Sequence, residues 1–275
     1  MYKRQYLDYL RRDRARRRNI RLAQALLLVV FLCAWEILPR MHILNPLLTS
    51  YPSALWPTFI DLWANGNLAH HILTTLSATL VGFTLSMVIG IVVAAALWWS
   101  DFLYKVLDPF LVVANAMPKI AFVPIFYLWL GSDYAVYGMA VAIAVFVTIM
   151  VVYAGFRGID LNKVKLARTF GASRWQVLVK VVLPGSVPTL IAAVKMNIGL
   201  ALVGVIVGEF QSADSGLGFL IMNGSQVFKL NIVMTAITML ALISSVMYLV
   251  VYRIEACLLY TSDACLLYTS PSPRD

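Results

Sequence analysis

Three ionisable side chains fall within long apolar stretches of this sequence: Lys119, Lys195 and Glu209. Burying a charge in such a stretch is expensive, so each side chain is a candidate for a role in function. Lys119 follows Pro118, and a helix broken by proline often borders a cavity, where a lysine can attract an anion. Lys195 and Glu209 also have a plainer interpretation, which we favour for Lys195: the lysine side chain reaches the aqueous layer at the inner end of the span, and Glu209 caps a helix or faces the outer water layer. The candidate residues for a polar path through these stretches are Met117, Pro118, Lys119, Asn197 and Glu209.

Side chains that hold metals or act as nucleophiles are scarce. The histidines are His42, His70 and His71, and all three lie in one segment between apolar stretches. Two adjacent histidines cannot both face one ion from a regular helix or strand, so we expect no metal site. A membrane-embedded enzyme would need His, Asp or Glu converging within the spans, and this reading is therefore disfavoured. Cys33 lies inside an apolar stretch and is interpreted as a packing residue.

The composition predicts that membrane helices position these residues. The chain is 61% hydrophobic and 13% charged, with a mean hydropathy of +0.82, whereas soluble domains carry roughly 25% charged residues. Apolar blocks of about 20 residues are long enough to cross a bilayer. The sequence predicts an all-α membrane protein with one integral membrane domain at 22–255 and six spans, at residues 22–38, 74–99, 107–130 (broken by Pro118 and Pro124), 135–155, 187–210 and 232–252.

The distribution of positive charge predicts the orientation of these spans. Nine of the 22 Lys and Arg lie in a basic arm at residues 1–21, directly before the first span. If this arm is cytoplasmic, the inside segments hold seventeen Lys and Arg and the outside segments hold two, so we expect both termini in the cytoplasm. The net charge of +9 is thus explained by contact with the lipid bilayer, and no nucleic-acid partner is expected.

Two further segments lie outside the spans. The segment 39–71 contains four prolines together with Trp56 and Trp63, and it is interpreted as an interfacial loop with a short helix along the membrane surface. Residues 256–262 repeat almost unchanged at 264–270, a unit too short and too few in number for a structural repeat. We interpret residues 256–275 as a non-native cloning or sequencing scar and exclude them from the fold.

The stretch at about 156–187, between the fourth and fifth spans, predicts two short helices that meet at Gly171. The first has an apolar face formed by Leu161, Val164, Ala167 and Phe170. The second follows Ser173, a plausible N-cap, and its apolar stripe consists of Trp175, Leu178, Val179 and Val182. Such a pair, attached to two spans, either transmits the motion of a partner into the membrane or rests on anionic lipid. The residue pattern by itself leaves both readings open.

The spacing in this stretch resembles the EAA loop of ABC importer permeases, whose pattern is Glu-Ala-Ala, three residues, Gly, nine residues and Ile-x-Leu-Pro. Gly171 takes the place of the glycine, and Val181-Val182-Leu183-Pro184 follows after nine residues. The first triplet differs, because it is Lys165-Leu166-Ala167, so only Ala167 fits and the glutamate is absent.

The resemblance extends over about residues 22–255 and points to the nitrate, sulfonate and taurine branch of the family. The segments that carry it are Trp35-Glu36, Met117-Pro118, Phe122-Val123-Pro124, Gly171-Ala172-Ser173-Arg174-Trp175-Gln176, Gly208-Glu209 and Gly216-Leu217-Gly218.

This resemblance implies a non-catalytic permease subunit of an ATP-driven importer, with six transmembrane helices of the ABC importer permease (MetI-like) type in the bacterial plasma membrane. In that family the permease is a dimer, each EAA loop docks as a coupling helix on an ATP-binding subunit, and an external solute-binding protein delivers a small solute. The implied solute is an anion such as a sulfonate, taurine or nitrate, or a vitamin precursor. The residues implied to contact the ATPase are Lys165, Leu166, Ala167, Arg168, Phe170, Gly171, Ala172, Ser173, Arg174, Leu183 and Pro184.

No cofactor is expected in this chain. The sequence lacks the Gly-x-x-x-x-Gly-Lys-Ser/Thr phosphate loop, so ATP and Mg²⁺ would be bound by the partner ATPase. The alternative is a secondary transporter driven by an ion gradient. Such a protein would be expected to show paired repeats and buried carboxylates along a path, and neither is evident in the sequence.

Overall fold

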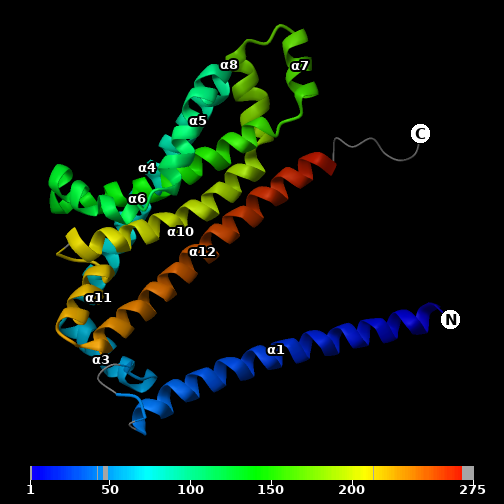
Figure 1. The fold of residues 1–275 in the computed structure, drawn as a ribbon. Helices are drawn as coiled ribbons and strands as arrows, with labels where there is room; N and C mark the ends of the chain where they lie inside the picture. Colours follow the sequence, from blue (N-terminus) through cyan, green and yellow to red (C-terminus); the bar gives the residue numbers. More distant parts are fainter. Residues whose placement is uncertain (1, 42, 46–48, 213, 268–275) are drawn as a thin grey trace. The chain divides into compact units, whose positions relative to one another are not determined.

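The computed structural model describes residues 2–41, 43–45, 49–212 and 214–267. Every regular element within these ranges is a helix, which confirms the all-α prediction (Figure 1). The elements are α1 (Tyr2–Arg40), α3 (Pro52–Ala64), α4 (Leu68–Trp99), α5 (Asp101–Ala116), η1 (Lys119–Phe122), α6 (Val123–Arg157), α7 (Leu161–Thr169), α8 (Arg174–Val177), η2 (Leu178–Val182), α9 (Leu183–Gly185), α10 (Val187–Ser212), α11 (Leu217–Gln226) and α12 (Leu230–Leu267).

The predicted spans all have counterparts among the described helices. Five helices are long and apolar enough to cross a membrane, namely Arg18–Arg40 within α1, all of α4, Tyr134–Arg157 within α6, Val187–Gln211 within α10, and Leu230–Glu255 within α12. The sixth counterpart is a bent pair, Asp101–Ala116 and Lys119–Ser132, whose axes meet at 88°. The third predicted span is therefore a broken span or a re-entrant loop.

The two prolines expected to break this third span act differently. Pro118 lies at the bend itself, between α5 and η1. Pro124 instead occupies the first turn of α6, where its missing N–H has no helical partner to lose, so the expectation that it breaks a helix is wrong. The second interruption is at Gly131, whose backbone is non-helical at φ +77° and ψ 173°.

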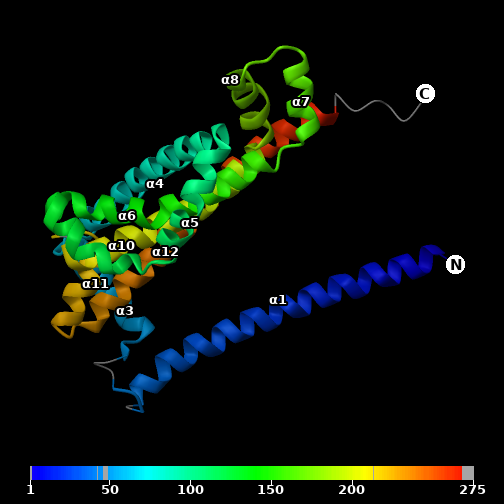
Figure 2. The same cartoon turned by 45° about the horizontal axis from the view of Figure 1, so that its top comes forward.

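The chain divides into two compact units: residues 1–66 together with 224–235, and residues 67–223 together with 236–275. In the second and larger unit, α6 packs along both α4 and α10 (Figure 2). Gly204 of α10 permits this closeness, because a Cβ atom there would lie 2.6 Å from the Cα atom of Ala140. Small residues are the usual means by which membrane helices approach each other so closely.

Buried polar side chains also tie these three helices together. Asn197 of α10 accepts a hydrogen bond from the Ser86 hydroxyl at 2.8 Å and donates one to the Thr148 hydroxyl at 2.5 Å. Ser86 lies on α4 and Thr148 on α6, and all three residues are buried. A polar group in an apolar interior is stable only with such partners, so this cluster fixes the register of the three helices.

The smaller unit is organised around Glu36 of α1. Its carboxylate accepts hydrogen bonds from the backbone N–H of Ser53 at 3.0 Å and from the Ser53 hydroxyl at 2.8 Å, and it pairs with Arg40 at 2.6 Å. These bonds hold the start of α3 against the end of α1. The rings of Trp56, Phe59 and Trp63 stack along α3, which confirms a short aromatic helix in the segment between the first two spans.

The helix α12 continues without a break from Leu230 to Leu267. No change of secondary structure therefore marks residue 255, where the repeated tail begins. The interpretation of residues 256–275 as a scar remains a prediction, and residues 268–275 lie outside the described part of the chain.

Candidate functional site

The loop between α6 and α10 folds as the predicted pair of helices, α7 and α8, joined at Gly171. The Asp160 carboxylate caps α7 by accepting a hydrogen bond from the backbone N–H of Asn162 at 2.8 Å. At the other end of α7, the Gly171 N–H donates to the Arg168 carbonyl at 2.9 Å and the Ala172 N–H donates to the Ala167 carbonyl at 3.1 Å. This bond pattern is a Schellman motif, and Gly171 adopts the positive φ of +80° that the motif requires.

The second helix of the pair has a complete N-terminal capping box. The Ser173 hydroxyl accepts a hydrogen bond from the Gln176 N–H at 3.3 Å, and the Gln176 side chain accepts one from the Ser173 N–H at 2.8 Å. Local hydrogen bonds therefore specify both the end of α7 and the start of α8. The corner between them is fixed by the sequence from Ala167 to Gln176.

In the structure, only some of the residues in the predicted apolar faces of the two helices are buried. Val164, Ala167 and Ala172 pack against the core formed around Phe156. Leu161 and Phe170, predicted to share that face, are exposed, and Phe170 is 83% exposed. Phe170 is the residue that ends α7, so its side chain leaves the helical pattern.

The second stripe changes because Leu178–Val182 is a π-helical turn. Leu178 and Val182 of the predicted stripe are buried together with Val177, whereas Trp175 and Val179 are exposed. In a π-helix each N–H bonds to the carbonyl five residues before it, and this wider turn brings Val177 and Val182 toward one face. Leu183–Gly185 then form the short helix α9, and α10 begins at Val187, where the fifth predicted span starts.

An exposed apolar edge results on the outer side of the corner. Leu166 is 59% exposed, and Phe170 is exposed to a still larger fraction. Both residues border a groove of about 600 Å³ between α7 and the turn that includes Val181. Lys165 is also exposed. Exposed apolar residues held by rigid local structure are typical of a surface that binds another protein.

Among the pathway candidates, Met117, Pro118 and Lys119 lie together at the 88° bend. The Lys119 ammonium donates to the Asn115 carbonyl at 2.7 Å and lies 5.8 Å from the centre of the Phe146 ring. Lys119 is therefore held at the break by its own chain and by α6, with part of its surface open.

The other two candidates are enclosed by protein in this chain. Asn197 belongs to the buried polar cluster of α4, α6 and α10. Glu209 is 1% exposed, and its carboxylate accepts hydrogen bonds from the Thr75 hydroxyl at 2.8 Å and from the Gly218 N–H at 2.7 Å. Glu209 therefore does not face an aqueous layer, because the loop before α11 covers it, and its bond to Gly218 in the first turn of α11 matches the capping interpretation instead.

Lys195 has a partner that the sequence did not reveal. Its ammonium pairs with the Glu255 carboxylate of α12 and lies 5.7 Å from the centre of the Tyr252 ring. The positive charge of Lys195 is thus paired within the larger unit, whether or not the side chain also extends to the aqueous surface. The two charges are 60 positions apart in the sequence, so no local signal indicates the pair.

His71 is likewise engaged: its Nδ1 atom accepts a hydrogen bond from the Gly216 N–H at 3.0 Å. Within the described ranges, no three His, Cys, Asp or Glu side chains are grouped to hold a metal ion.

The family pattern of the binding-protein-dependent transport system inner membrane component matches residues 86–258, which include the whole loop with α7 and α8. The chain belongs to this family. SsuC of Bacillus subtilis (strain 168), a putative aliphatic sulfonates transport permease protein, is 26% identical over 219 residues, which are 79% of each chain. RibX of Chloroflexus aurantiacus, a riboflavin transport system permease protein, is 31% identical over 219 residues, covering 77% of this chain and 82% of that one.

Solved structures agree with this assignment at the level of the fold. An inward-facing conformation of the MetNI methionine ABC transporter superposes with a TM-score of 0.64 at 19% identity, covering 72% of this chain and 97% of that chain. The chain is therefore a multi-pass ABC importer permease subunit of the MetI-like fold, and the secondary transporter is not favoured.

Proposed function

We propose that this permease forms the path for a small, anionic solute and receives the energy for transport from a separate ATPase through the corner of α7 and α8. The observation that carries the proposal is that Leu166 and Phe170 are exposed on a corner that three local motifs hold rigid. Because Val164 and Ala167 pack against the core around Phe156, force applied to the corner reaches α6 directly.

The proposed assembly contains two copies of the permease, two ATP-binding subunits and an external solute-binding protein. ATP and Mg²⁺ belong to the ATP-binding subunits, which hydrolyse the nucleotide. Closure of these subunits moves the corner, and the spans alternate between outward-open and inward-open cavities. The excess of Lys and Arg in the arm and in the loop supports a cytoplasmic position for both, together with both termini.

The proposed solute class rests on Lys119 and on the relatives. A lysine at a broken helix offers a positive charge and unpaired backbone groups to an anion. SsuC is named for the transport of aliphatic sulfonates and RibX for the transport of riboflavin. The candidate solutes are therefore a sulfonate, a taurine-like or nitrate-like anion, and a vitamin or its precursor.

The test is co-purification of the permease with the ATP-binding subunit encoded beside it. Gly171→Pro removes the N–H that bonds to Arg168 and forbids the positive φ, so we expect the ATPase to be lost from the complex. Gly171→Asn is the control, because asparagine tolerates this conformation and should retain the ATPase. Equal retention by both variants, or no ATPase binding by the unmodified chain, would overturn the proposal.

A further inference from the structure

Three arginines and two tryptophans line a cavity of about 250 Å³ beside the corner of α7 and α8. Arg157 comes from the end of α6, Arg168 from α7 and Arg174 from the first turn of α8. Trp98 and Trp99 are the last residues of α4. Tryptophans and arginines at the end of a membrane span are typical of the level of the lipid headgroups.

The positive charge of this cavity is only partly neutralised. Asp101 is the acidic residue that lines it, and this carboxylate is shared by Lys105 at 2.8 Å and Arg157 at 3.6 Å. Arg174 donates to the Trp99 carbonyl at 3.3 Å. The Arg168 guanidinium has no acceptor within the part of the chain that the structure describes. The cavity therefore offers several unused N–H donors to an anion.

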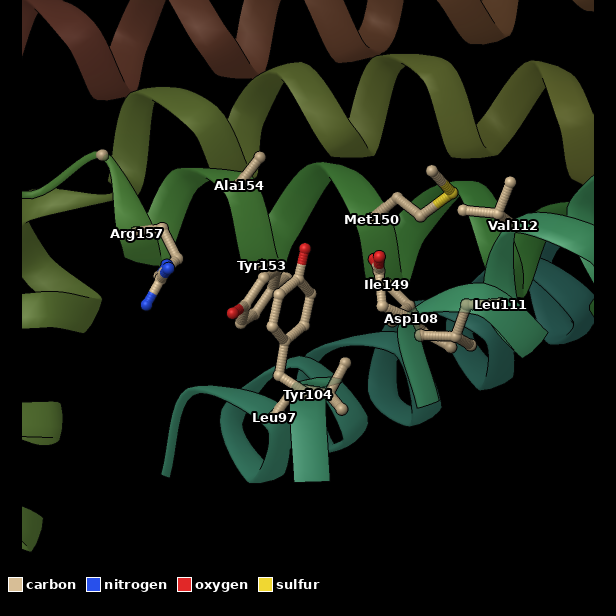
Figure 3. A pocket seen from close by; sticks show the side chains of 11 residues that line it. Leu97, Tyr104, Asp108, Leu111, Val112, Ile149, Met150, Tyr153, Ala154 and Arg157 are labelled. Atoms are coloured by element: carbon tan, nitrogen blue, oxygen red, sulfur yellow. The ribbon is translucent and has the colours of Figure 1, made fainter. Parts of the chain in front are cut away.

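A second cavity, of about 450 Å³, shares Arg157 with the first (Figure 3). The Tyr104 and Tyr153 rings stack at 4.4 Å, and the Arg157 guanidinium lies 5.8 Å and 6.0 Å from their centres. The acidic residue in this cavity is Asp108, which interacts with the Tyr104 hydroxyl. The apolar side chains that line the remainder are Leu97, Leu111, Val112, Ile149 and Met150.

We propose that the two cavities together bind an anionic phospholipid. Its phosphate lies among Arg157, Arg168 and Arg174, and its aliphatic part follows the apolar cavity between α5 and α6. Arginine matches the geometry of a phosphate with paired donors, and basic pockets between membrane helices on the cytoplasmic side suit anionic headgroups. A free phosphate or a soluble phosphate ester would leave the apolar cavity empty, so the chemistry of both parts favours the lipid.

The resemblance implies ATPase contacts for Arg168 and Arg174, whereas the lipid gives these two arginines a role distinct from that of Leu166 and Phe170. The arginines line the cavity beside Trp98 and Trp99, whereas the apolar pair borders the groove on the other side of α7. The lipid thus braces the corner against the end of α4. This inference does not depend on the binding of an ATPase.

The experiment titrates the purified full-length chain with dioleoyl phosphatidylglycerol and measures bound lipid by native mass spectrometry. Removing two charges in the double variant Arg168→Gln, Arg174→Gln should weaken binding by roughly 30-fold. The double variant Lys163→Gln, Lys180→Gln removes the same charge from residues that line the opposite groove, and it should change binding by less than about 3-fold. Equal losses in the two double variants would show that lipid binding depends on the total positive charge of the chain and not on this cavity, which would overturn the proposal.

Two further experiments test whether the ligand has both an aliphatic part and a phosphate. Met150→Trp fills the apolar cavity and leaves the arginines in place, so it should also weaken phosphatidylglycerol binding. Soluble glycerol phosphate in millimolar excess should not displace the lipid. Displacement by glycerol phosphate, or full binding by the Met150→Trp variant, would show a site for the phosphate alone and contradict the proposed lipid.

Discussion

The Thr75 hydroxyl donates to the buried Glu209 carboxylate at 2.8 Å and accepts a hydrogen bond from the Leu217 N–H at the same distance. One side chain of α4 therefore connects the end of α10 with the start of α11. The Gly218 N–H completes the arrangement by donating to Glu209 at 2.7 Å. The resemblance-bearing segments Gly208-Glu209 and Gly216-Leu217-Gly218, separate in the sequence, are thus two halves of one hydrogen-bonded structure.

Thr75→Val should destabilise the protein by about 1–3 kcal/mol, because it leaves a buried carboxylate and a buried N–H without their partner. Thr75→Ser keeps the hydroxyl and should cost less than half as much. Thermal unfolding of the purified variants in detergent measures the difference. If valine proves no more harmful than serine, the hydroxyl contributes no more to stability than the methyl group that serine lacks, and the hydrogen-bond account fails.

Asn197→Leu should lower stability by roughly 0.5–2 kcal/mol, because the Ser86 and Thr148 hydroxyls lose their shared partner. Thr148 keeps its bond to the Ala144 carbonyl at 2.8 Å, which limits the loss. The same thermal measurement applies. An accompanying change in solute selectivity would contradict the enclosed position of Asn197 and return it to the pathway.

Gly204→Leu should prevent correct packing of α10 against α6, since a Cβ atom at this position already meets the backbone of Ala140. Gly199→Leu is a matched control on the same helix, because a Cβ atom there meets nothing within 4 Å. The yield of monodisperse protein in size-exclusion chromatography should fall sharply for the first variant and little for the second. Similar yields would indicate that the helices separate more easily than this packing implies.

The pair of Lys195 and Glu255 should show coupling between α10 and α12. Lys195→Glu and Glu255→Lys should each lower thermal stability, and combining them should restore part of the loss, because the reversed charges attract again. Additive losses in the double variant would mean that the two side chains act independently.

The parts predicted from the sequence are those with a local or compositional signal. The spans follow from apolar length, the bend from Pro118, and the corner at Gly171 from the spacing of glycine, serine and proline. The parts that were missed depend on contacts between distant residues. Thr75 and Glu209 are 134 residues apart, and no pattern along the chain indicates that they meet.

The π-helical turn at Leu178–Val182 was missed for a different reason. Its apolar residues fit an α-helical stripe equally well, and only packing against the core around Phe156 selects Val177, Leu178 and Val182 as the buried residues. Helix periodicity predicts which residues are apolar, whereas the tertiary contacts determine which of them are buried.

The most direct test of energy coupling through the corner is photocrosslinking to the co-expressed ATP-binding subunit. A benzophenone amino acid replaces Phe170, which is 83% exposed on the corner, or Phe228, which is 77% exposed and lies between α11 and α12. The account predicts a crosslink to the ATP-binding subunit from position 170 and none from position 228. A crosslink from position 228 would contradict energy coupling through the corner. So would the absence of a crosslink from position 170 in a complex that still contains the ATPase.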